Sequence, residues 1–343
     1  MARSDYFNDV PRARGRRFLI LGAIVLGGGL LAACSSGTSS GTTTSTGSGS
    51  SSGDTTINFG FSDLSVDQTP MLVARDEGFF KKNHLIVNYK EFNGGGSTVA
   101  AALASNSLDG AHGSLEFLES NAKKITDVVA VQQISQSAYQ IYTSSDITSP
   151  SQLAGKTIGV SSLSGAEYIW WNSALPALGI PVSSVHFVVI SGGSAKFAAL
   201  KSGAIGAIVD TVGHEPTGAP KPLVTYQHLP QQPHLVTFTK SWLDTHKTAV
   251  QEFVTSINEA TAWTKSHQAA ATQICEKDEN ATAAECNLTD DIKPPTVWTW
   301  SATGALDVQS IEDTAPDLEK LYPGVTNAGI KAFLDTSFTG TNP

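Results

Sequence analysis

Arginine is scarce in most of this chain. Five arginines lie within the first 17 residues, and only Arg75 follows them. The first 33 residues also hold two aspartates, so the remainder has 17 basic and 29 acidic groups, a formal charge of −12. Because this acidic remainder repels anions and contains no basic stripe, nucleic acid and anionic lipid surfaces are excluded as partners.

Catalytic and metal-binding motifs are lacking too. No nucleophile stands at a recognisable spacing from a general base, and the sequence has no phosphate-binding Walker loop and no zinc motif. Its cysteines number three: Cys34, Cys275 and Cys286. The sequence therefore predicts a protein without enzyme activity, cofactor or metal site.

The chain has little that resembles a membrane span. Its apolar run at residues 18–31 follows Arg16 and Arg17 and is too short to cross a bilayer comfortably. The run ends in Leu31-Ala32-Ala33-Cys34, which resembles a bacterial lipobox. We expect residues 1–33 to be a lipoprotein signal peptide of the general export route. Acylated Cys34 would then anchor the protein to the cell membrane on its extracytoplasmic side. The alternative is an unprocessed core cysteine after a short buried helix.

Residues 34–56 follow as a segment made almost wholly of Ser, Gly and Thr. Such a composition buries too little apolar surface to fold, so we expect a flexible tether. In an oxidising exterior, Cys275 and Cys286 would form a disulfide if their geometry allows it; two free buried thiols are the alternative.

From residue 57 onward, short apolar runs alternate with amphipathic segments. This alternation is typical of strands interleaved with helices in a mostly parallel sheet. We predict strands at 57–61, 85–92 and 156–161, a helix from Pro70 to about residue 83, and a helix start at Ser149-Pro150. After about residue 235 we predict helices, with long ones at 248–266 and 307–321.

An internal repeat gives the clearest sign of domain organisation. Gly95-Gly96-Ser97 and its following Ala-Leu pair recur 97 positions later as Gly192-Gly193-Ser194 and Ala199-Leu200. The repeat predicts two similar α/β lobes, in which each Gly-Gly-Ser opens a helix with unpaired backbone N–H groups. Open α/β sheets bind ligands where such groups converge, although a plain turn and helix cap is the alternative for each motif.

Several segments carry a family resemblance. Residues 60–62 and 70–80, the latter ending in Glu77-Gly78-Phe79-Phe80, are similar to ABC-transporter solute-binding proteins of the nitrate, sulfonate, taurine and thiamine-precursor group. Residues 85–87, 102–113, 153–160 and 200–210 extend the resemblance, which covers residues 57 to about 271. It implies a two-lobed periplasmic-binding-protein type II fold of the Venus-flytrap kind, whose chain crosses twice between lobes.

The resemblance also implies an arrangement of lobes. We expect lobe I at residues 57–143, lobe II at 144–233, and a return to lobe I with C-terminal helices at 234–343. The crossings are placed near residues 141–145 and 234–239, and closure would be a hinge motion about them. A monomer would deliver a small molecule to an ABC permease and its ATPase.

Candidate ligand-binding residues follow the strands or open the helices of both lobes. Each has a plain structural alternative, since serines cap helices and His112 suits a satisfied core position. The candidates are Ser62, Asp63, Gln68, Gly96, Ser97, His112, Gly113, Ser114, Ser162, Ser164, Gly165, Trp170, Ser194, Asp210 and Thr211.

Aromatic candidates would stack on a planar ligand. Trp170 and Trp171 are adjacent on a helix and point about 100° apart, so we expect at most one to face the ligand. Tyr139 and Tyr142 are further candidates, with core packing expected for at least one of them.

Charge favours one class of ligand. The planar fork of arginine suits oxyanions, yet Arg75 is flanked by acidic residues and expected to be exposed. Lys196 is a single cation near a candidate loop. Carboxylates on or near the expected site disfavour anions: Asp63, Glu116, Glu167 and Asp210. We therefore expect a neutral or cationic ligand, nitrogenous or aromatic.

Two alternative functions share the fold that the resemblance implies. One is an enzyme of thiamine-precursor or menaquinone biosynthesis, and the other is a receptor module that senses a ligand without transporting it. The lipobox and tether favour a surface carrier over both.

Overall fold

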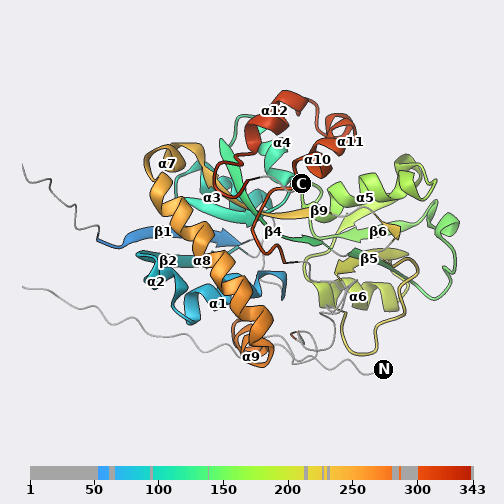
Figure 1. Ribbon diagram of the computed structural model, residues 1–343. Helices are drawn as coiled ribbons and strands as arrows, with labels where there is room; N and C mark the ends of the chain where they lie inside the picture. Colours follow the sequence, from blue (N-terminus) through green and yellow to red (C-terminus); the bar gives the residue numbers. More distant parts are fainter. Residues whose placement is uncertain are drawn as a thin grey trace, which may run out of the picture. The chain divides into compact units, whose positions relative to one another are not determined.

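The computed structural model describes residues 53–61, 66–92, 96–137, 139–211, 215–225, 228–229, 232–279, 286 and 300–340. These all belong to one compact unit of residues 51–343. The predicted signal peptide, Cys34 and most of the tether lie outside the described residues. Within the described part of the chain, no helix combines the length and apolarity needed to cross a membrane. The described residues form two β-sheets with helices on their faces (Figure 1).

The first sheet has five strands in the order β2-β1-β3-β9-β4. Strand β1 pairs in parallel with β2 and β3, whereas β9 is antiparallel to β3 and β4. The carboxyl ends of β1 and β3 therefore meet at one edge, together with the start of β9. The strands are β1 (Thr55–Phe61), β2 (Leu85–Glu91), β3 (Gly110–Gly113), β4 (Val128–Ser137) and β9 (Gln232–Thr239).

The second sheet has four strands in the order β5-β8-β6-β7. Strand β6 is parallel to β7 and β8, and β5 is antiparallel to β8. The strands are β5 (Tyr139–Thr143), β6 (Thr157–Val160), β7 (His186–Val189) and β8 (Ala207–Thr211). The orders β2-β1-β3 and β7-β6-β8 are equivalent, so the predicted duplication is confirmed in the topology.

Helices α3 (Gly96–Ala104) and α6 (Gly193–Lys201) extend the duplication to single residues. Both begin at the second glycine of a Gly-Gly-Ser motif, and both are nine residues long. Each follows an edge strand of its sheet, β2 or β7. The two-lobed periplasmic-binding-protein fold expected from the sequence is therefore the fold of this chain.

The segments expected near the interlobe crossings overlap strands of the two sheets. Residues 141–145 were expected to connect the lobes, but Ile141 lies in β5 of the second sheet, which follows β4 of the first sheet after residue 138. Residues 234–239 lie within β9 of the first sheet, whereas Val224 bridges to Ile141 of the second. The expected lobe boundaries, Thr143 and Pro233, both lie inside paired strands.

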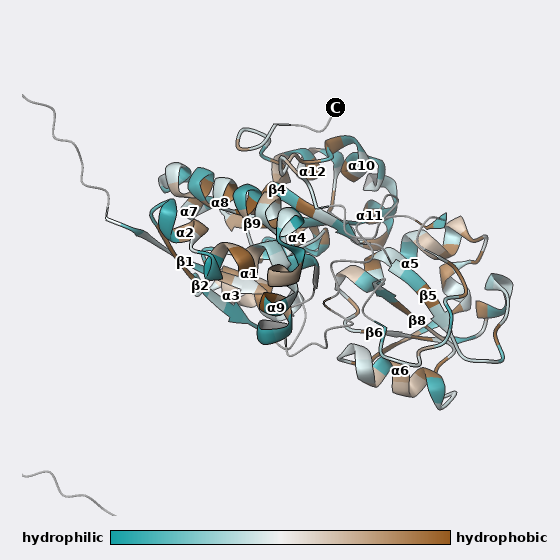
Figure 2. Cartoon of the chain, turned by 60° about the horizontal axis from the view of Figure 1, so that its bottom comes forward, coloured by the Kyte–Doolittle hydropathy of each residue, from teal (hydrophilic) through white to brown (hydrophobic). Residues whose placement is uncertain are grey.

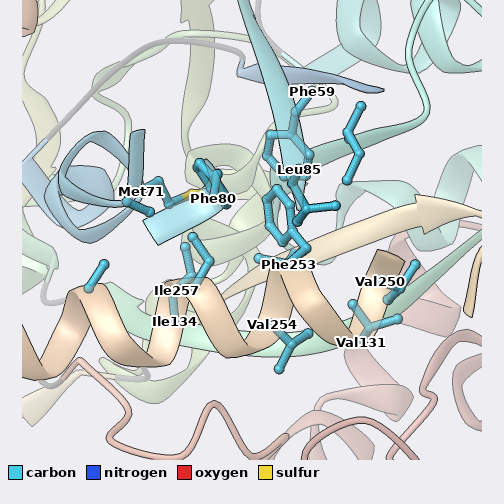
Figure 3. Packing of buried hydrophobic residues seen from close by; sticks show 14 of the residues in the cluster. Phe59, Met71, Phe80, Leu85, Val131, Ile134, Val250, Phe253, Val254 and Ile257 are labelled. Carbon is cyan, nitrogen blue, oxygen red and sulfur yellow. The ribbon is translucent and has the colours of Figure 1, made fainter. Parts of the chain in front are cut away.

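One face of the first sheet is covered by α1 (Thr69–Asp76), α2 (Phe79–Lys82), α8 (Lys247–Ser266) and α9 (Gln268–Glu279). Helix α8 turns an apolar stripe inward, and Phe253 lies 5.0 Å from the Phe59 ring and 5.1 Å from the Phe80 ring (Figure 3). Along α8 in Figure 2, hydrophobic residues alternate with hydrophilic ones. A helix of this amphipathic pattern is stabilised mainly by burial of its apolar face.

The opposite face of that sheet packs against α3, against α4 and against three C-terminal helices. Successive residues of β9 show the alternation of a strand, since Leu235 faces this side and Val236 faces α8. The helices are α4 (Glu116–Ala122), α10 (Val308–Asp313), α11 (Ala315–Leu321) and α12 (Asn327–Phe333).

The second sheet lies between α5 (Ala166–Ala177) and α6. Val209 of β8 faces α5, whereas Ile208 faces α6. The remaining elements are short: η1 (Val66–Gln68), η2 (Pro150–Leu153), η3 (Val182–Ser184) and α7 (Lys240–Thr245).

Two predicted helices are divided in the structure. The segment 70–83 splits into α1 and α2 at Gly78, whose φ of 77° is left-handed and ends a helical run. The segment 307–321 splits at Thr314, with Pro316 in the first turn of α11. The predicted start at Ser149-Pro150 opens only η2, capped by Ser149 and Gln152. Helix α8 matches its predicted range to within one residue.

Candidate ligand-binding site

The candidates after β1 are only partly described. Ser62 and Asp63 lie outside the described residues. Gln68 ends η1 and is 2 % exposed. Its side-chain amide lies 3.0 Å from Nδ1 of His112, so two candidates separated in sequence are brought into contact.

A second group of candidates surrounds Glu116 at the same edge of the first sheet. The carboxylate of Glu116 accepts a hydrogen bond from the backbone N–H of Ser114 (3.0 Å). A Cβ placed on Gly96 would lie 3.5 Å from Glu116 Oε1, and one on Gly113 would lie 2.7 Å from it. Glu116 therefore sits beside the N-terminus of α3, where Ser97 is exposed. The hydroxyl of Ser114 is buried with no hydrogen-bond partner among the described residues.

Beneath these residues lies a buried cluster of titratable side chains. Asp67 of η1, His112 of β3 and His234 of β9 place one ligand-type atom each within 4.8 Å of one another. Burial lowers the pKa of His112 to about 4, although Asp67 opposes the shift and His234 adds to it. The His112 imidazole is therefore neutral at pH 7.

In the second lobe, an ion pair occupies the region after β6. The carboxylate of Glu167, in the first turn of α5, accepts hydrogen bonds from Ser161 N (2.8 Å) and Ser161 Oγ (3.1 Å). Lys196 of α6 forms an ion pair with the same carboxylate, and its side chain is only 4 % exposed. The pair joins the first turns of α5 and α6. Its cation, Lys196, is the one that was expected near a candidate ligand-binding loop.

The loop before α5 holds three of the serine and glycine candidates. Ser162 and Ser164 are half-buried, and their hydroxyl oxygens lie 3.2 Å apart. The backbone N–H of Ser164 also donates to Ser162 Oγ (3.2 Å), and Gly165 caps α5 with extended backbone. The structure therefore brings these candidates together in one turn, where the hydrogen bonds within the loop are those of a helix start.

The N-terminus of α6 meets the end of β8. A Cβ placed on Gly193 would lie 3.5 Å from Oδ2 of Asp210, and Asp210 Oδ1 accepts a hydrogen bond from Thr211 N (2.9 Å). Thr211 is buried, whereas Ser194 is exposed at the start of the helix. A carboxylate of the chain therefore lies at the N-terminus of α6, as Glu116 lies at that of α3.

The stacking role predicted for Trp170 does not agree with the structure. Trp170 and Trp171 are both 0 % exposed, because they pack edge to face on each other beneath α5. Trp170 also packs against Tyr139. It borders a cavity of about 310 Å³ between α5 and α10–α11, but its side chain is not accessible to solvent. Tyr142 is likewise buried, and burial followed by the nearby Glu215 raises the pKa of its hydroxyl.

Away from these residues, Cys275 of α9 is joined to Cys286 by a disulfide, with a Cα–Cα distance of 5.8 Å. Both cysteines are buried against α8 and its neighbours. The bond fixes α9 to Cys286.

The profile of the family described as NMT1/THI5 like matches residues 65–271. This chain belongs to the NMT1/THI5-like family. The match includes most of both lobes and agrees with the extent of the sequence resemblance. A search of curated protein sequences gave no significant match.

Solved structures show the same fold. The alkanesulfonate-binding protein SsuA of Xanthomonas axonopodis pv. citri, bound to MOPS, has a TM-score of 0.68 at 16% identity, covering 83% of this chain and 99% of that one. The nitrate-binding protein NrtA of Synechocystis PCC 6803 also has a TM-score of 0.68, at 15% identity over 83% and 87% of the two chains. The desulfurization enzyme DSZB has a TM-score of 0.58 at 17% identity over 83% and 97%.

Sequence reasoning missed two side chains of this NMT1/THI5-like protein. Asp67 and His234 were not among the candidates, although both lie in the buried cluster with His112. No local signal marks them, because Asp67 precedes a helix and His234 lies within a strand. Their relation to His112 arises only when β9 pairs with β3.

Proposed function

We propose that this protein is a lipid-anchored, extracytoplasmic solute-binding protein that delivers a small organic molecule to an ABC importer. The observation that carries the proposal is the duplicated edge, where α3 and α6 start at equivalent places in two lobes of an NMT1/THI5-like chain. Ligands of open α/β sheets bind at the carboxyl ends of the strands, where helix N-termini supply backbone N–H donors. A solute that touches both lobes would favour the closed arrangement, which the permease would recognise.

The charge of these edges supports a neutral or cationic ligand. Glu116 lies beside the N-terminus of α3, and Asp210 lies beside that of α6. A carboxylate beside each helix start lies near the place at which an anion would be bound, and it repels an anionic ligand. Lys196 forms an ion pair with Glu167, which lowers its value as a counter-ion for a solute. SsuA is named as an alkanesulfonate-binding protein and NrtA as a nitrate-binding protein. A chain that binds a neutral or cationic ligand would differ from both in ligand charge.

The ligand class is tested by recovery and by titration. Native mass spectrometry of the protein purified from its own host would identify a retained solute. Calorimetry against alkanesulfonates, nitrate, thiamine-pathway pyrimidines and other nitrogenous metabolites should detect binding among the nitrogenous compounds. Tight binding of a sulfonate or nitrate, with no response to the others, would refute the proposed ligand class.

Charge variants make that test specific. For a cationic ligand, Glu116→Gln and Asp210→Asn should each weaken binding by about tenfold or more, equivalent to about 1.4 kcal/mol. Asp146→Asn is the matched control, since its carboxylate is 63 % exposed. Equal affinities in all four proteins, wild type included, would remove the carboxylates from ligand recognition.

The lipid anchor rests on the sequence Leu31-Ala32-Ala33-Cys34 and the tether that follows. Cys34→Ala should abolish incorporation of labelled fatty acid and leave the protein either unprocessed or free of the membrane. Incorporation of label into the variant would contradict the assignment.

We further propose that the protein binds its solute without converting it. The desulfurization enzyme DSZB has a similar fold, so fold alone does not separate binding from catalysis. A solute recovered unchanged in mass after long incubation, together with a permease and an ATPase encoded beside this gene, would support transport. Conversion of the solute would favour an enzyme, and absence of a permease would favour a sensor.

A further inference from the structure

The buried cluster of Asp67, His112 and His234 joins three separate elements on one face of the first sheet. His112 of β3 pairs with Val236 of β9, and His234 lies two residues away on the same face of β9. Asp67, in η1, extends its carboxylate over both rings, and Trp300 Nε1 donates to the backbone oxygen of Asp67 (2.9 Å). The cluster is therefore built on two paired strands and a fixed turn.

Its geometry is that of a compact ligand set. Asp67 Oδ2 lies 3.6 Å from His112 Nε2 and 2.5 Å from His234 Nδ1. Zinc binds imidazole nitrogen and carboxylate oxygen at about 2.0–2.2 Å, which places neighbouring donors of a tetrahedral site about 3.3 Å apart. The first distance is close to that value, and the second would widen by about 1 Å as an ion replaces a shared proton.

One atom of the cluster points independently to a ligand. The His112 side chain is 6 % exposed, and its Nε2 has no hydrogen-bond partner among the described residues. The other nitrogen, Nδ1, lies 3.0 Å from the amide of Gln68, an interaction that sets the ring orientation. A buried imidazole nitrogen aimed at a carboxylate, but too far away to bond it, is suited to a cation between the two.

The surroundings of His234 are polar as well. Ser135 Oγ lies 3.0 Å from His234 Nδ1, on the neighbouring strand β4. The site thus contains one carboxylate, two imidazoles, an amide and a hydroxyl within a buried region. A lone divalent ion there is compensated by one carboxylate and held by neutral donors.

We propose that Asp67, His112 and His234 bind a divalent transition-metal ion, for which Zn²⁺ is the matching choice. Three protein ligands leave a fourth position for water, as in open zinc sites. Gln68 acts as a positioning residue through His112. The sequence predicted no metal site because the three ligands belong to three elements and form no local spacing motif. This inference is independent of the transport function proposed above.

The test uses purified protein without a polyhistidine tag, stripped with a chelator and then dialysed. Titration with ZnCl₂ by calorimetry, with metal counted by mass spectrometry, should give about one Zn²⁺ per chain. His112→Ala and His234→Ala should each lower affinity by at least about 100-fold, and Gln68→Ala by about 10-fold or more. His84→Ala is the control, because His84 also lies near a carboxylate (3.8 Å from Asp54) but is 63 % exposed.

A second measurement needs no variant. Co²⁺ added to wild-type protein should give the visible absorption of a four-coordinate ion, which Zn²⁺ should displace at a stoichiometry of one. Circular dichroism melts would show whether each variant remains folded. Failure of the wild type to bind Zn²⁺ stoichiometrically would overturn the proposal. Binding that survives in His112→Ala and His234→Ala would do the same, because the ion would then be held by other residues.

Discussion

The ion pair between Glu167 and Lys196 makes a sharp test of how the second lobe is held together. Lys196 is 4 % exposed and Glu167 is 16 % exposed, so both charges are removed from most of the solvent. Lys196→Met keeps an unbranched apolar stem of similar length but leaves the Glu167 carboxylate without this cation. We expect the variant to be clearly less stable than the wild type.

The magnitude follows from what remains around Glu167. Breaking one partner of a buried ion pair costs about 3–5 kcal/mol. The two hydrogen bonds from Ser161 persist, which places the expected loss of unfolding free energy near the lower limit, about 3 kcal/mol. A domain of this size loses about 2 °C of Tm per kcal/mol, so Tm should fall by about 6 °C. Lys156→Met is the control, since the pair of Lys156 with Asp146 is 37 % and 63 % exposed and contributes less than about 1 kcal/mol.

Calorimetric melts and urea unfolding of four proteins would measure the coupling. These are the wild type, Lys196→Met, Glu167→Gln and the double variant, which should recover much of the lost stability because both charges of this pair are removed. If Lys196→Met unfolds within about 1 kcal/mol of the wild type, the pair is not a buried one and the reasoning fails. A double variant as unstable as the sum of the single ones would have the same meaning.

Two further predictions concern the backbone and the disulfide. Cys275→Ser should lower the unfolding free energy by about 3 kcal/mol, because the cross-link closes a loop of 11 residues in the unfolded chain. The Tm of wild-type protein melted in reductant should fall by the same amount, and an unchanged Tm would show that the bond contributes nothing. Gly110→Ala should cost about 3 kcal/mol or more, since its Cβ would lie 2.6 Å from the backbone oxygen of Thr237. Gly193→Ala is the matched control, as its Cβ meets only Asp210 Oδ2 at 3.5 Å and should leave the urea midpoint unchanged.

Much of the fold was predictable because local patterns and tertiary structure agree. The runs at 57–61, 85–92 and 156–161 are strands, and the Gly-Gly-Ser repeats open α3 and α6. The strand pairing of residues 141–143 and 232–239 was not predictable, because their partners lie far away in sequence. The apolar character of a short segment predicts that the segment is buried. Which sheet it joins depends on the strands with which it pairs.

The site was predictable only where chemistry follows a strand end. Gly96, Gly113 and Ser114 do gather around Glu116, as expected of residues at one carboxyl edge. The burial of Trp170 could not be foreseen. Two adjacent indoles mark a helix as apolar, but the sequence does not indicate how many neighbours cover each ring. Asp67 and His234 were missed for a related reason, because only strand pairing places them beside His112.

The carboxylates at the two helix starts carry the last step of the argument about the ligand. The duplication repeats a glycine-opened helix in each lobe, but the carboxylate beside it has a different origin each time: Glu116 comes from α4, and Asp210 from the end of β8. Inheritance of one duplicated unit accounts for the helices and not for these two positions. Two unrelated segments thus place the same charge against the same kind of helix terminus. A binding site that favours a cation or an N–H donor over an anion gives that arrangement a single physical reason.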